Sequence, residues 1–212
     1  MQFLNKVLAK KLPKLKLQDS DLDNIGLISI NGKKVTFEEF SKMENLKVKG
    51  NLDLRYSTVK ELPSGLEVGG YLWLSGSKIK ELPSGLTVGG SLKLEGSMIT
   101  ELPKGLTVGR DLDLRRSTIK ELPSGLKVGG DLDLYGSKIK ELPLGLTVGG
   151  HLYLDGSKIK ELPSGLTVGG DLYLMRTAIK ELPEDLKVKG KIFISKGMEK
   201  TFNAGKFKSK VH

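Results

Sequence analysis

Residues 126–145 read LKVGGDLDLYGSKIKELPLG, and this pattern repeats along most of the chain. It first begins at Leu46 and returns every 20 residues, without insertion, up to the unit that begins at Leu166. These are seven full units, and an eighth begins at Leu186 as LKVKGKIFISKG before the pattern breaks off. A fixed period of this length is typical of a solenoid, in which each unit buries its apolar face against its neighbours.

The 20 positions of one unit, numbered as columns 1 to 20 from its first leucine, predict how a coil folds. Leu, Val or Ile fills columns 1, 3, 7, 9, 14 and 17. Columns 6 to 10 alternate polar and apolar residues, which predicts a short strand that pairs in parallel with the next coil. Pro at column 18 bends the chain, and Gly at columns 4, 5 and 20 permits tight or left-handed turns. The length that remains is too short for a helix, so we expect an extended or turn-like convex side.

Column 12 carries a small hydroxyl residue in every full unit. Its members are Ser57, Ser77, Ser97, Ser117, Ser137, Ser157 and Thr177. A hydroxyl directly after a strand can hydrogen-bond to the backbone at the corner of the coil. We therefore interpret this column as structural.

The pattern LxLxxSxIxxLP resembles the leucine-rich repeat, whose usual form is LxxLxLxxNxL. The second half of that form is matched, in the unit quoted above, by Leu132, Leu134, Ser137 and Ile139. The Leu-Pro that follows is similar to the 20-residue bacterial type found in secreted effector proteins. There are two departures, since Ser or Thr replaces the usual Asn, and Gly69 and its equivalents replace the first leucine. The resemblance covers roughly residues 46–197 and implies a leucine-rich-repeat solenoid with a parallel β-sheet on its concave face and no regular helices on its convex side.

This resemblance implies a binding scaffold rather than a catalyst, and the repeat type suggests a bacterial or phage origin. The effector relatives that are ubiquitin ligases carry an additional catalytic domain with a nucleophilic Cys. This chain has no Cys, which also excludes disulfides and thiolate metal sites. We expect no enzymatic activity.

Three segments of the chain follow from the repeat boundaries. Residues 1–45 predict a small mixed α/β N-terminal cap that includes a degenerate first coil at 15–25. Asn31-Gly32 is a turn signal, and Thr36 with Glu39 resembles a capping box before a short helix at 37–43. Residues 46–185 hold the seven repeats, and residues 186–212 hold a truncated last coil and a basic tail.

The net charge of +10 is concentrated at the C-terminus, because residues 186–212 carry eight Lys and one Glu. No run of apolar residues approaches the ~18 needed to span a membrane. Residues 1–15 interleave Lys with apolar residues and show no small-residue cleavage site, so we expect no signal peptide. The predicted location is the cytoplasm, or another compartment reached without a recognisable signal peptide.

Columns 6, 8, 10 and 11 differ between units, and we call them together the variable face. All five Tyr and the single Trp lie in these columns. Tyr, Trp and Arg dominate the hot spots of protein interfaces, although stacked aromatics on an ordinary sheet face are the alternative. The residues predicted to contact a partner are Tyr56, Tyr71, Trp73, Asp111, Asp113, Arg115, Arg116, Asp131, Asp133, Tyr135, His151, Tyr153, Asp155, Tyr173 and Arg176.

Four carboxylates on adjacent strands, Asp111, Asp113, Asp131 and Asp133, are expected to repel one another and to raise one another's pKa. Nearby Arg or Lys residues, a basic partner segment or a divalent cation would offset this repulsion. Flat sheet faces seldom supply six oxygen ligands, so we expect no metal and no cofactor. His151 lies between Asp131 and Asp171 in the same column, but no nucleophile or oxyanion donors accompany it, so the set fails the test for an active site.

Two functions remain open from the sequence, beside the possibility that the chain has no evolved partner. The first is a non-catalytic scaffold whose aromatic and acidic concave face recognises a partner protein that carries basic residues. The alternative is association of the Lys-rich tail with nucleic acid or another anionic surface, for which charge alone suffices. The units are also similar enough for a consensus design or a recent duplication, in which case the face would have no evolved partner.

Overall fold

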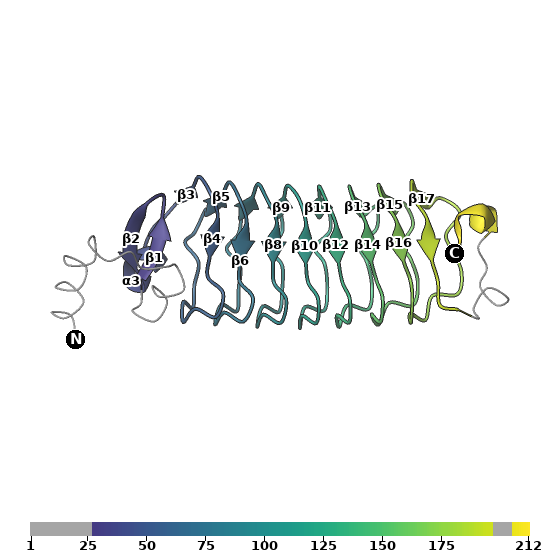
Figure 1. Ribbon diagram of the computed structural model, residues 1–212, viewed down its shortest axis with the longest axis horizontal. Helices are drawn as coiled ribbons and strands as arrows, with labels where there is room; N and C mark the ends of the chain where they lie inside the picture. The colour runs from purple at the N-terminus through teal and green to yellow at the C-terminus, as the bar shows by residue number, and fades with distance from the viewer. Residues whose placement is uncertain (1–26, 197–204) are drawn as a thin grey trace.

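The structure is a computed structural model that describes residues 27–196 and 205–212, and it shows a β-solenoid built from 20-residue coils (Figure 1). Each coil contributes one strand to each of two parallel eight-stranded sheets. Between residues 46 and 196, all of which the structure describes, the coils contain no helix, as predicted. The degenerate first coil predicted at 15–25 lies outside the described residues.

Two sheets form, whereas the sequence predicted one. Sheet I uses columns 2 and 3, in β3 (Lys47–Val48), β5 (Glu67–Val68), β7 (Thr87–Val88), β9 (Thr107–Val108), β11 (Lys127–Val128), β13 (Thr147–Val148), β15 (Thr167–Val168) and β17 (Lys187–Val188). Sheet II uses columns 7 and 8, in β4 (Leu52–Asp53), β6 (Leu72–Trp73), β8 (Leu92–Lys93), β10 (Leu112–Asp113), β12 (Leu132–Asp133), β14 (Leu152–Tyr153), β16 (Leu172–Tyr173) and β18 (Ile192–Phe193). Columns 1 to 3 alternate as well, but over three positions only, which is shorter than the run that indicates a strand, whereas the alternation around sheet II extends over columns 6 to 10.

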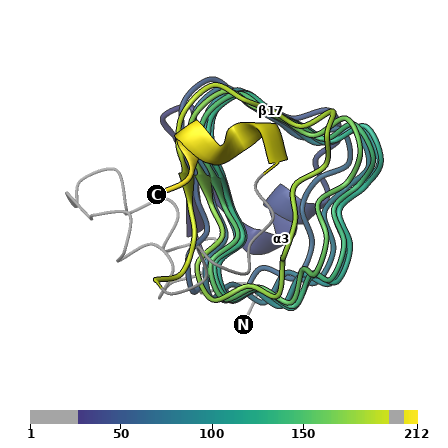
Figure 2. The same ribbon diagram turned by 90° about the vertical axis from the view of Figure 1, so that its right-hand side faces the viewer.

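The strands pair in strict repeat register. Leu112 of β10, for example, faces Leu92 of β8 on one side and Leu132 of β12 on the other. The coils stack in a nearly straight row in Figure 1 and superpose closely when viewed along the row in Figure 2. Sheet II is therefore one side of a nearly straight stack of coils, and not the concave inner surface that the sequence led us to expect.

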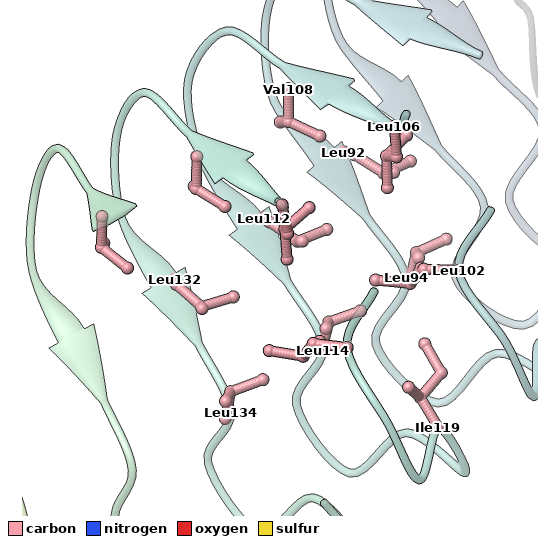
Figure 3. Packing of buried hydrophobic residues seen from close by; sticks show 14 of the residues in the cluster. Leu92, Leu94, Leu102, Leu106, Val108, Leu112, Leu114, Ile119, Leu132 and Leu134 are labelled. Atoms are coloured by element: carbon pink, nitrogen blue, oxygen red, sulfur yellow. The ribbon is translucent and has the colours of Figure 1, made fainter. Parts of the chain in front are cut away.

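The apolar columns form one continuous core inside the coils. Their side chains come from both sheets and from the segment that follows sheet II, and Figure 3 shows them pointing into the same interior. Leu112 of sheet II and Ile119 after it have no exposed surface, while Val108 of sheet I is 2% exposed. Since every unit repeats these columns, each coil buries its leucines against the coils above and below.

A β-hairpin and a short helix precede the first coil. Strands β1 (Leu27–Ile30) and β2 (Lys33–Thr36) pair in antiparallel around the turn at Asn31-Gly32. Helix α3 (Phe37–Ser41) begins after Thr36, whose side chain accepts a hydrogen bond from the N–H of Glu39, while the Glu39 carboxylate accepts one from the N–H of Thr36. The predicted hairpin turn and capping box are confirmed, and the helix ends two residues earlier than predicted.

The Asn31 side chain covers the first edge of sheet I. Its amide donates to the carbonyl of Lys47 (2.8 Å) and accepts from the N–H of Lys49 (2.8 Å). A side-chain amide has the same donor and acceptor as a peptide unit, so Asn31 takes the place that the backbone of a preceding coil would occupy. Covering an edge in this way limits pairing with another chain.

Residues 205–212 cover the opposite end of the stack of coils. The 3-10 helix η2 (Gly205–Lys210) lies across the last coil in Figure 2, with Phe207 buried against the core. Val211 forms a parallel bridge with Ile192, and the Lys210 ammonium donates to the carbonyl of Val188 (2.6 Å). This part of the basic tail therefore terminates the stack.

The hydroxyls of column 12 differ in their hydrogen bonding. Thr177 Oγ1 donates to the carbonyl of Leu174 (2.7 Å), which is the contact expected at this corner. The six serine hydroxyls of the column are buried and have no hydrogen-bond partner among the described residues. A buried hydroxyl without a partner destabilises the folded state.

We expect Ser137→Ala to leave the free energy of unfolding unchanged or to raise it by up to about 1 kcal/mol, because the substitution removes an unsatisfied hydroxyl. Thr177→Val is expected to lower it by about 1 kcal/mol, because it removes a made hydrogen bond. Urea unfolding of both variants measures the difference. A Ser137→Ala variant that loses as much stability as Thr177→Val would show that the serine column is hydrogen-bonded in solution.

Candidate functional site

The variable face lies along sheet II. Column 8 is the second residue of each strand and runs in register from Asp53 to Phe193 through all eight strands. Column 6 precedes each strand, and columns 10 and 11 follow it. Because the register is strict, every residue predicted to contact a partner lies beside its equivalents in the neighbouring coils.

Column 6 is a ladder of hydrogen bonds between coils. In six steps a side-chain acceptor binds the backbone N–H of the same column in the next coil, at 2.7–3.3 Å. The acceptors are Asn51, Ser91, Asp111, Asp131, His151 and Asp171. These hydrogen bonds between coils are sufficient to explain why column 6 is restricted to short polar side chains. Tyr71 is the exception among the full units.

The four central carboxylates occupy distinct environments. Asp111 and Asp131 belong to the ladder, while Asp113 is buried and binds Arg115 through Nη2 (2.7 Å) and Nε (3.0 Å). Burial raises the pKa of Asp133 above its ordinary value, and the Asp113 charge raises it further, which agrees with the repulsion expected from the sequence. The hydrogen bonds from Arg115 to Asp113 are the main cause of a raised pKa for the Arg115 guanidinium.

His151 is an acceptor in the ladder and not half of an ion pair. Its Nδ1 accepts the N–H of Asp171 (2.9 Å), so this nitrogen carries no proton in that arrangement. The Asp171 carboxylate lies 3.4 Å from the same nitrogen, a distance that does not correspond to a salt bridge while Nδ1 is unprotonated. His151, which the sequence analysis considered as an acid-base group, therefore serves as a hydrogen-bond acceptor for the backbone of the next coil.

The aromatic residues form two separate groups. Tyr71 stacks on Trp73 with ring centroids 5.4 Å apart in the second coil. At the other end, Tyr173 stacks between Tyr153 (4.6 Å) and Phe193 (4.7 Å). Phe193 is not among the residues predicted to contact a partner, because that prediction used only the seven full units; its place in column 8 of the last partial coil identifies it.

A pocket of about 330 Å³ opens in coils three to six, and the second aromatic group contributes Tyr153 to it. It brings together six of the predicted residues with one that the prediction omitted, Glu95. Its lining is formed by Glu95, Arg115, Arg116, Asp133, Tyr135, Tyr153 and Asp155. The remaining predicted residues do not line this pocket.

Two arginines with unusual backbone conformations meet at Tyr135. Arg116 (φ 52°) and Arg176 (φ 57°) are left-handed in column 11, where four other coils have Gly. Their guanidinium carbons lie 6.0 Å and 5.8 Å from the centre of the Tyr135 ring, although Arg176 belongs to a coil two repeats away. Strain of this kind in a non-glycine residue is concentrated at functional sites.

We expect Arg116→Gly to raise the free energy of unfolding by about 1 kcal/mol, because glycine adopts a left-handed conformation without strain. The gain is partly offset by loss of the contact with Tyr135. Thermal unfolding of Arg116→Gly and of Gly136→Ala measures the effect, because the second variant introduces a non-glycine residue at the equivalent position of the next coil. A lower melting temperature for Arg116→Gly would show that the arginine contacts outweigh the strain.

Asp155 is only 6% exposed, and burial raises its pKa above the ordinary value. Its folded form consequently binds a proton at higher pH than its unfolded form, and the stability it contributes at low pH is lost as pH rises through the folded-state pKa. Asp155→Asn keeps an oxygen for the N–H of Met175 and removes the charge. We expect the variant to gain stability over wild type as pH rises from about 4, the ordinary Asp value. Unfolding at several pH values tests this, and a constant difference would contradict it.

No family model, no curated protein and no solved structure matches the chain. Among residues 27–196 and 205–212, no helix has the length and apolar character to cross a membrane.

Proposed function

We propose that this chain is a non-catalytic scaffold of the leucine-rich-repeat type, which recognises a partner protein on the variable face. The observation that carries the proposal is the meeting of Arg116 and Arg176 over Tyr135. Column 11 accepts Gly in other coils, so stacking alone does not require an arginine at either position. Arg and Tyr side chains beside a pocket are the composition of a protein-binding hot spot.

The leucine-rich-repeat assignment is supported by the buried leucine columns and the parallel strands of sheet II. Sheet I and the straight stack depart from the expected form. The binding proposal depends on the side chains of the variable face and would apply to either form of solenoid.

The experiment is affinity capture from a bacterial lysate with three proteins. These are the wild type, a Tyr135→Ala/Tyr153→Ala variant of the pocket, and a Lys80→Ala/Lys140→Ala variant of column 15 as the matched control. We expect a protein that the wild type and the control retain and the pocket variant loses. Retention by all three would contradict recognition on the variable face.

The alternative function, association of the Lys-rich tail with nucleic acid or another anionic surface, predicts binding through exposed lysines that make no contacts needed for folding. Lys210 donates to backbone carbonyls, so deletion of the tail would also uncover the end of the stack. Lys206 and Lys208 are exposed, and their replacement by Ala is the cleaner test. Retention that this pair abolishes and that decreases steeply with salt would favour the alternative.

A further inference from the structure

Asp155 is a buried carboxylate that forms no ion pair among the described residues, and the Arg176 charge acts on it only from a longer distance. The residue is 6% exposed, and its Oδ1 accepts one hydrogen bond, from the N–H of Met175 (2.8 Å). No Lys, Arg or His nitrogen of the described residues lies within 4.0 Å of its carboxylate, yet it lines the pocket. A buried charge without a partner is strongly unfavourable, and most such groups in proteins are paired.

The cations already in the pocket are engaged elsewhere. Arg115 contacts three carboxylates, with Nη2 at 2.7 Å from Asp113 and 3.1 Å from Glu95, and Nε at 3.5 Å from Asp133. Arg116 lies over the Tyr135 ring. With Arg176, which acts on Asp155 and lies over Tyr135, three guanidiniums balance four carboxylates at the pocket, those of Glu95, Asp113, Asp133 and Asp155. An added positive charge would meet an excess of acid.

The walls of the pocket suit the same kind of group. Tyr135 and Tyr153 both line it, and the faces of aromatic rings attract ammonium and guanidinium groups. Tyr135 already attracts two guanidiniums of this chain on its ring. A volume of about 330 Å³ is at the lower end of the range for ligand pockets, which favours a single side chain over a larger ligand.

We propose that the pocket receives one Lys or Arg side chain of the partner protein, with Asp155 as its counter-ion and Tyr135 and Tyr153 as its walls. This inference rests on the proposed function and assigns the chemistry of the partner at that site. Asp155 contacts the incoming cation directly, and Asp133 adds a second carboxylate at longer range.

The test uses Nα-acetyl-lysine amide as the probe and its Nε-acetyl form as a neutral control. NMR titration of the full chain would follow the amide of Met175, which donates to Asp155, and those of Gly136 and Gly156. We expect saturable shifts with the charged probe, at a Kd on the order of millimolar, and none with the neutral one. Nα-acetyl-arginine amide is expected to behave like the charged lysine probe.

Two variants locate the site. Asp155→Asn is expected to weaken probe binding about tenfold or more, the size expected for loss of a hydrogen bond to a charged group. Asp171→Asn is the matched control, because Asp171 likewise accepts a backbone N–H from the next coil but lies outside the pocket. Its Kd is expected to stay within about twofold of wild type. An unchanged or raised melting temperature of Asp155→Asn would show that the fold is intact.

The outcomes separate this inference from the proposed function. Equal binding of the charged and neutral probes, or of wild type and Asp155→Asn, would overturn the inference. A partner that is lost from the Tyr135→Ala/Tyr153→Ala variant but retained by Asp155→Asn would leave the proposed function standing and overturn only the cation pocket. Spermidine binding more than a hundredfold tighter than the lysine probe, with no captured protein, would assign the pocket to a free amine and overturn the protein source.

Discussion

Leu134→Ala is expected to lower the free energy of unfolding by about 2–5 kcal/mol, the range for truncation of a buried leucine. Leu134 has no exposed surface and occupies column 9 of the fifth of the seven full units, with equivalent leucines in the coils on both sides. The cavity cannot collapse easily, because the coils are connected by backbone hydrogen bonds on both sides of the site, from Leu114 to Asp133 and from Leu134 to Tyr153.

Urea unfolding of Leu134→Ala beside Leu144→Ala measures this effect with a matched control. Leu144 belongs to the same unit and is 78% exposed, so its truncation is expected to change stability by less than about 0.5 kcal/mol. In a solenoid each coil contacts only its neighbours, so a weakened central coil also tends to separate the unfolding of the two halves. A lower urea m-value for Leu134→Ala would report that separation. Equal costs for the two substitutions would contradict the burial of column 9.

Gly149→Ala is expected to destabilise the protein by about 3 kcal/mol, at the upper end of the usual cost of overpacking. A Cβ on Gly149 would overlap the carbonyl oxygen of Gly129 in the preceding coil. The backbone of column 4 cannot retreat, because Gly149 donates to Val128 (2.9 Å) and Gly169 donates to Val148 (2.9 Å).

Gly145→Ala, on the other side of β13, is the control that separates close approach from backbone conformation. Gly145 has φ 67° and open space around its Cα, so alanine there meets only the strain of a left-handed residue, about 1 kcal/mol. Thermal or urea unfolding compares the two variants. A cost for Gly149→Ala no greater than for Gly145→Ala would show that neighbouring coils separate readily. Column 4 carries Lys only in the first and last coils, as Lys49 and Lys189. Lys49 has no preceding repeat to confine its side chain, because the close contact in this column is always with the preceding coil.

The glycines show one limit of reading this sequence. Columns 4, 5 and 20 were interpreted together as permitting tight or left-handed turns. Column 20 agrees, since Gly145 and its equivalents have positive φ. Gly149 and Gly150 do not, and their side-chain space is filled by the preceding coil. Glycine is thus required for two different physical reasons, a positive φ in column 20 and a close approach of the preceding coil in columns 4 and 5. Only the distance between coils distinguishes the two.

The candidate site shows a second limit. The sequence placed Asp155, Tyr135 and Arg176 on one face, because columns 8, 10 and 11 vary while the others repeat. It did not show that Asp155 is buried or that Arg176 contacts a ring two coils away. Nor did it show that the side chains of column 6 accept hydrogen bonds from the backbone of the next coil. These facts depend on rotamers and on spacings across the stack, which a column of residue types does not contain.

The sequence by itself determined the length of the coil, the columns that form the core, the strand of sheet II, and the hairpin and capping box of the N-terminal cap. Each of these depends on the periodicity of apolar residues or on turn and cap residues within a few positions, so the information is local. The tertiary structure alone decided the second sheet, the straight stack, the covered ends and the pocket. All of them arise where coils contact one another, perpendicular to the chain, and there the outcome depends on how closely two backbones approach.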